Sequence, residues 1–129
     1  MAVAKNATGK SVNYYELLGE RVNVDSFAWM VRSVAYKLYQ YDSTPIERMA
    51  QAEEKFPGWW HPVFSYNQNG VKNGYLLVKD SGLYISTGYS ASDCICFIRE
   101  LLKIYDLDLE EDFVYSARSN KSENKEKEV

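Results

Sequence analysis

Apolar positions recur at helical spacing in three stretches of the chain. The first predicts a helix over 25–40, capped by Asp25 or Ser26. A second helix is predicted over 44–55, since Thr44-Pro45-Ile46-Glu47 places a capping hydroxyl, an early proline and a carboxylate in the order typical of helix starts. Ser90 and Asp93 have the spacing of a capping box and predict a third helix over 90–105. The residues expected to be buried are Phe27, Met30, Val31, Val34, Leu38 and Tyr41 in the first helix, Ile46, Met49, Ala50 and Phe56 in the second, and Cys94, Phe97, Ile98, Leu101, Leu102 and Tyr105, with Ile95 and Ile104 beside them, in the third.

Between the second and third helices the apolar pattern becomes alternating. Alternation predicts strands over 60–66, 74–79 and 83–87. Asn-Gly pairs at 69–70 and 73–74 and the turn at 80–82 connect them, and connections this short indicate an antiparallel meander. We therefore predict an α+β fold, in which a three- to four-stranded antiparallel sheet packs against about three helices, the last of them along the sheet.

The ends of the chain are polar. Residues 1–12 lack a pattern and are expected to be flexible, and 13–18 suggest a short helical turn. Residues 13–117 are expected to form a single domain, and 118–129 a disordered charged tail with no apolar residue before the last valine. The short stretch 113–115 fits either a helical turn or an edge strand.

Charge, hydropathy and cysteine content limit the classes of protein and the cellular compartment that fit this sequence. The net charge of −3 disfavours general nucleic-acid binding, which needs a positive field. No apolar run approaches the roughly 20 residues of a membrane-spanning helix, and the amino terminus lacks the apolar region of a secretion signal. Cys94 and Cys96 are too close in sequence to form a disulfide framework. A cytoplasmic protein is expected.

Several motifs resemble catalytic or metal sites but lack their context. Residues 4–11 resemble a phosphate-binding loop without the strand that must precede it, and 88–92 resemble a nucleophile elbow whose only histidine, His61, comes before the serine. Cys94 lies near a helix start but on its apolar stripe, which predicts burial rather than reactivity. The acidic stretch 106–112 departs from a calcium loop at its sixth and twelfth positions. The sequence therefore predicts no catalytic residue, cofactor or metal site.

Aromatic residues give the strongest positive signal, at 15% of the chain with 11 tyrosines. If one sheet face is open, its aromatic side chains form a contact patch. If helices cover that face, the same residues are core, and the sequence leaves both alternatives open. The acidic stretch is a second candidate contact surface. The candidate interaction residues are Trp59, Trp60, His61, Phe64, Tyr66, Tyr75, Tyr84, Asp106, Asp108, Glu110, Glu111 and Asp112.

Three classes of function fit these observations. The favoured hypothesis is a small non-enzymatic domain that docks on another protein, a profile shared by inhibitors, immunity proteins and adaptors of phage or other mobile elements. One alternative is a small enzyme or small-molecule binder whose pocket has no sequence motif. Another is stacking of single-stranded nucleic acid on the aromatic face, which would require the chain's cations to gather beside it. Those cations are Lys72, Lys79, Arg99 and Lys103.

Overall fold

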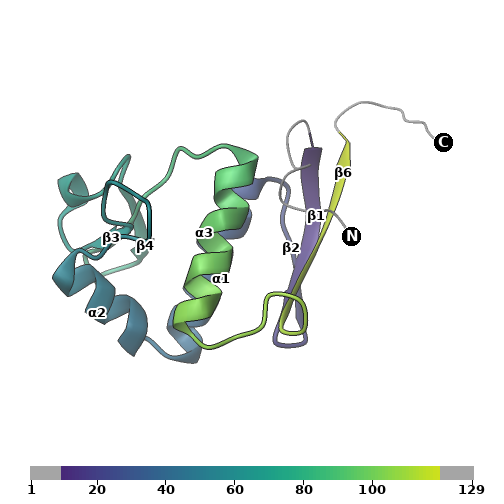
Figure 1. Cartoon of the computed structure of the whole chain (residues 1–129), viewed down its shortest axis with the longest axis horizontal. Coiled ribbons are helices and arrows are strands. Elements are labelled where there is room, and N and C mark those ends of the chain that lie inside the picture. The colour runs from purple at the N-terminus through teal and green to yellow at the C-terminus, as the bar shows by residue number, and fades with distance from the viewer. Residues whose placement is uncertain (1–9, 120–129) are drawn as a thin grey trace. The chain divides into compact units, whose positions relative to one another are not determined.

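The computed structural model describes residues 10–119, which form an α+β fold of three α-helices and two three-stranded antiparallel sheets (Figure 1). The α+β class, the antiparallel pairing and the number of helices are confirmed. The chain divides into two compact units, and we call residues 32–88 unit 2 and the rest unit 1. The boundary falls inside α1 (Phe27–Tyr41), after Val31. No helix within residues 10–119 is long and apolar enough to cross a membrane.

Unit 1 contains a sheet that the sequence did not predict. Its central strand β1 (Lys10–Leu17) pairs with β2 (Glu20–Asn23) on one side and with β6 (Phe113–Ser119) on the other. The stretch expected to be a helical turn is therefore strand, and β1 and β6 extend into the predicted flexible ends. A register shift between Val12 and Tyr14 explains the error, since the irregularity buries Val12 and Tyr15 at a spacing of three, which imitates a helix.

The turn between β1 and β2 is a two-residue hairpin loop. Leu17 pairs with Glu20 across it, and the two loop residues, Leu18 and Gly19, have φ angles of 52° and 84°. Two successive positive φ angles are typical of a type I′ turn, where asparagine and glycine are preferred. Leu18 is an unusual choice there, and its side chain is 43% exposed.

Helix α3 (Ala91–Ile104) completes the regular elements of unit 1 and follows the sequence prediction closely. The Ser90 hydroxyl accepts a hydrogen bond from the Asp93 amide at 3.2 Å, which confirms the predicted cap. Cys94 is buried as expected, with its thiol 3.9 Å from the Tyr89 carbonyl oxygen. The prediction was wrong for Ile104, which is exposed. The buried residues of the helix are Cys94, Ile95, Phe97, Ile98, Leu101 and Leu102.

Unit 2 begins with the second part of α1 and continues through α2 (Thr44–Ala52). Ser43 rather than Thr44 occupies the cap position of α2, and its side chain makes no capping hydrogen bond. The helix also ends earlier than predicted, at a left-handed Glu53 with φ of 49°. Tyr41, the last residue of α1, was expected in the core but is 62% exposed. Ile46, Met49, Ala50 and Phe56 are buried as predicted.

The second sheet lies in unit 2 and has the order β3-β5-β4. Strands β3 (Phe64–Ser65), β4 (Tyr75–Val78) and β5 (Leu83–Ile85) are antiparallel, but β5 is central, so the predicted meander is wrong. The connection from β3 to β4 contains a 3-10 helix, η2 (Gln68–Gly70), whose start is capped by the Asn67 side chain. This longer connection carries the chain past the position next to β3, which β5 then fills.

Candidate functional site

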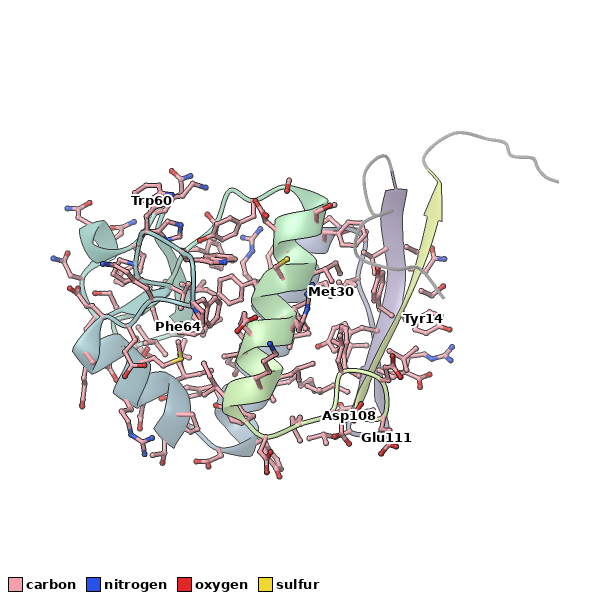
Figure 2. All side chains as sticks on the ribbon, viewed as in Figure 1. Tyr14, Met30, Trp60, Phe64, Asp108 and Glu111 are labelled. Atoms are coloured by element: carbon pink, nitrogen blue, oxygen red, sulfur yellow. The ribbon has the colours of Figure 1, made fainter. Side chains whose placement is uncertain are left out.

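The register of the unit 2 sheet separates the aromatic residues that the sequence analysis had placed on one face. Phe64 and Tyr75 both pair with Ile85, whereas Tyr84 pairs with Ser65. Directly paired residues point to the same side of a sheet and successive residues to opposite sides, so Phe64 and Tyr84 face opposite ways. Phe64 is fully buried and lies within the unit (Figure 2). A single open aromatic face is therefore ruled out as the geometry of the candidate site.

Trp60 is the most exposed large apolar side chain among the described residues, at 78%. It belongs to the loop between α2 and β3, where a strand had been expected. That loop contains a tight turn in which the Trp59 amide donates to the Phe56 carbonyl oxygen at 3.0 Å. Pro57 and Gly58 occupy the central positions, and the φ of 82° at Gly58 suits the third residue of a type II turn.

Four ring systems in this loop form a continuous series of edge-on contacts, which we call the aromatic ladder. Ring centroids are 5.2 Å apart between Phe56 and Trp59, 5.7 Å between Trp59 and His61, and 4.7 Å between His61 and Trp60. Phe56 and His61 are buried, Trp59 is half-buried and Trp60 stands at the outer edge of the unit (Figure 2). The ladder thus connects a buried ring to an exposed indole and holds that indole against a buried imidazole.

A second cluster in unit 2 surrounds the carboxylate of Glu47. The Tyr39 hydroxyl donates to one carboxylate oxygen and the Ser43 hydroxyl to the other, both at 3.3 Å. Burial, followed by the charge of Glu47, raises the pKa values of Tyr39 and Tyr66. Glu47 and Tyr39 are half-buried, and Tyr66 is 42% exposed. We call Tyr39, Ser43, Glu47 and Tyr66 the Glu47 cluster.

The acidic stretch belongs to unit 1 and forms an ordered turn between α3 and β6 (Figure 2). One carboxylate oxygen of Asp108 accepts hydrogen bonds from the amides of Glu110 and Glu111 at 2.7 and 2.9 Å. The Asp112 carboxylate accepts from the Asp108 amide at 2.7 Å. The backbone bonds from Glu111 and Glu110 lower the pKa of Asp108. Asp106 is exposed with a φ of 58°. The carboxylates of Asp108 and Asp112 are therefore engaged in shaping the turn.

The two predicted contact surfaces thus belong to different units. Of the aromatic candidates, Trp60, Tyr66 and Tyr75 are exposed, Trp59 and Tyr84 are half-buried, and His61 and Phe64 are buried. Within residues 10–119, no group of three histidine, cysteine or acidic side chains could hold a metal ion.

Sequence reasoning missed two exposed aromatic residues on α1, Trp29 and Tyr36, which are 49% and 41% exposed. Both fall outside the apolar stripe of the helix, and an aromatic residue outside that stripe is the sequence signal that could have identified them as exposed. It also missed the Glu47 cluster, because Glu47 was assigned only a capping role. Tyr39 and Glu47 lie on different helices, and no sequence spacing rule links their side chains.

Comparison with known proteins adds no family to this description. No family model matches the chain, and neither a curated protein nor a solved structure matches it. Function has to be inferred from the side chains of this chain alone.

Proposed function

We propose that this chain is a small non-enzymatic domain that binds another protein, with the indole of Trp60 as the central contact. The observation that carries the proposal is the 78% exposure of Trp60 against a buried His61. Tryptophan is enriched among the residues that dominate protein interfaces, because it contributes a large apolar area and has few rotatable bonds. The ladder restrains the indole further, which reduces the ordering cost of binding.

The size of the Trp60 contact can be worked from its exposed area. An aromatic side chain buries up to about 250 Å², and apolar burial is worth roughly 25 cal/mol per Å². Covering the exposed 78% of this indole would therefore contribute at most about 5 kcal/mol. Part of this is offset by ordering and by desolvation of polar neighbours. A loss of about 2 kcal/mol on truncation, or roughly 30-fold in Kd, is a reasonable minimum for a central contact.

Stacking of nucleic acid on the same residues receives less support. It would require Lys72, Lys79, Arg99 and Lys103 to gather beside the aromatic rings. The Lys72 ammonium donates to the Thr87 and Gly88 carbonyl oxygens at 3.1 and 2.7 Å, a bonding pattern that ties down the backbone. Protein docking needs no such cluster of cations.

The test is affinity capture from a lysate of the source organism with three forms of the chain, each carrying a carboxyl-terminal tag. The forms are the natural sequence, Trp60→Ala, and Trp29→Ala as a matched control, because it deletes the same side chain at another exposed position. Circular dichroism and a thermal unfolding curve first establish that all three are folded. Captured proteins are then identified by mass spectrometry.

We expect one stoichiometric protein to be retained by the natural chain and by Trp29→Ala but lost by Trp60→Ala. The purified partner should then bind the Trp60→Ala form at least roughly 30-fold more weakly in a calorimetric titration. A partner that binds Trp60→Ala as tightly as the natural chain would contradict the proposal. So would the capture of no partner by a folded, abundant natural chain.

A further inference from the structure

The carboxylate of Glu47 lacks a cationic partner within the part of the chain that the structure describes. Its hydrogen-bond partners are the neutral hydroxyls of Tyr39 and Ser43, both at 3.3 Å. Some carboxylates elsewhere in the described residues do have a cationic partner, as in the pairs of Arg21 with Glu16 and Lys103 with Glu100. A half-buried charge satisfied only by two long bonds to hydroxyls retains unmet capacity for a cation.

The carboxylate also retains room for further hydrogen bonds. An ionised glutamate has about four acceptor positions, and the two hydroxyls use two of them. Tyr66 is 42% exposed and lies within electrostatic reach of Glu47, because the charge of Glu47 contributes to raising the pKa of Tyr66. Glu47 is itself only half-buried, so the cluster is partly accessible to solvent.

Two phenol rings near one carboxylate provide two kinds of attraction for the same ligand group. A carboxylate binds a guanidinium group through two parallel hydrogen bonds, and the planar guanidinium also stacks on aromatic rings. The face of a tyrosine ring attracts a cation within about 6 Å of its centre. This chain already contains such a contact elsewhere in unit 2, where the Arg32 guanidinium lies 4.3 Å from the centre of the Tyr75 ring.

We propose that the Glu47 cluster binds an arginine side chain of the partner protein, with the guanidinium group paired to the Glu47 carboxylate and in contact with the ring of Tyr66. The inference rests on the proposed docking function and names the chemistry that the partner must present. It assigns charge recognition to Glu47 and apolar contact to Trp60, both within unit 2.

The probe for this test is N-acetyl-arginine amide, titrated into the full ¹⁵N-labelled chain through the millimolar range. N-acetyl-citrulline amide is the matched probe, because it has nearly the same shape and no charge. The variants are Glu47→Gln and, as a matched control, Glu54→Gln, which removes the same charge from an exposed glutamate of unit 2. Tyr66→Phe and Tyr66→Ala test the ring, since only the alanine variant deletes it.

We expect saturable shifts of the Tyr39, Glu47 and Tyr66 amides with the arginine probe and none with the citrulline probe. Glu47→Gln should raise the Kd of the arginine probe roughly tenfold, because a hydrogen bond to a charged group is stronger than one to a neutral amide. Glu54→Gln should leave that Kd unchanged. Tyr66→Ala should weaken binding and Tyr66→Phe should retain it. The amide spectrum of each variant shows whether it is folded.

The proposal is overturned if both probes shift the same amides equally, if no amide of the cluster shifts, or if Glu47→Gln binds the arginine probe as well as Glu54→Gln does. These outcomes are separable from failure of the docking function. Loss of the captured partner by Trp60→Ala, together with an inert Glu47 cluster, would retain the docking function and remove only the assignment of an arginine ligand.

Discussion

Tyr115 carries a buried hydroxyl group with no hydrogen-bond partner among residues 10–119. The residue is 5% exposed on β6, and its ring packs edge-on against Phe27 at 5.9 Å and lies 6.2 Å from the ring of Phe113. Substitution of Tyr115 by phenylalanine removes the hydroxyl and preserves these ring contacts. It therefore isolates the free-energy cost of burying one polar atom.

The magnitude follows from that cost. A buried polar group without a partner destabilises the folded state by about 1–3 kcal/mol relative to a paired one. Tyr115→Phe removes this penalty, so we expect the free energy of unfolding to rise by about 1 kcal/mol, the lower end of the range. Tyr39→Phe is the matched control because the same atom is deleted from a hydroxyl that donates to Glu47 at 3.3 Å. That variant should lose about 0.5–1 kcal/mol.

The assay is urea unfolding followed by fluorescence and circular dichroism, with the same m value required for all forms. Opposite signs for the two tyrosine variants would support the reasoning. A loss of more than about 0.5 kcal/mol in Tyr115→Phe would refute it, since the hydroxyl would then have a partner such as a buried water.

Tyr115 also makes the free energy of unfolding dependent on pH in the alkaline range. Burial raises the pKa of Tyr115. The folded chain therefore keeps this proton at a pH where the unfolded chain, with a tyrosine pKa of about 10, releases it. The contribution of this proton to the free energy of unfolding is therefore fully present below about pH 10. It is lost as the pH rises through the raised pKa of the folded chain. Tyr115→Phe should show a smaller alkaline loss of stability than the natural chain.

Two further predictions concern turns in unit 1. Leu18→Asn should raise the free energy of unfolding by about 1 kcal/mol in urea titrations, because asparagine tolerates the φ of 52° better than leucine does; an unchanged or lower value would contradict the turn assignment. Asp108→Asn should reduce the loss of stability in acid, measured as the urea midpoint against pH. The lowered pKa of Asp108 means that its contribution is present above the unfolded value of about 4 and is lost as the pH falls through the folded value. Equal acid sensitivity of both forms would show that the backbone bonds to Asp108 contribute nothing measurable.

The sequence by itself determined those features whose causes are local. The cap at Ser90 and the apolar stripe of α3 were predictable because helical hydrogen bonds and side-chain contacts join residues within four positions. The burial of Ile46 and Met49 followed from the same spacing. The end of α2 was less well predicted, because the helix stops at Ala52 and the turn at Pro57 and Gly58 belongs to the loop that follows.

Pairing between distant segments was decided only in three dimensions. β1 and β6 are about a hundred residues apart in sequence. The register shift after Val12 also interrupts the alternation of apolar and polar residues from which β1 could have been predicted. The position of β5 between β3 and β4 likewise depends on a connection whose path no local pattern specifies. Strand partners are selected by the burial of whole faces, which a window of a few residues does not contain.

The candidate site shows the same division. Composition and alternation identified Trp60 and Phe64 together as contact residues, because both are aromatic and lie four positions apart. Tertiary structure separated them, leaving Trp60 exposed and Phe64 fully buried. It also brought Tyr39 of α1 within hydrogen-bonding distance of Glu47 of α2. Sequence supplies the chemical groups, whereas their exposure and mutual distance depend on how separate elements pack, since those contacts are nonlocal.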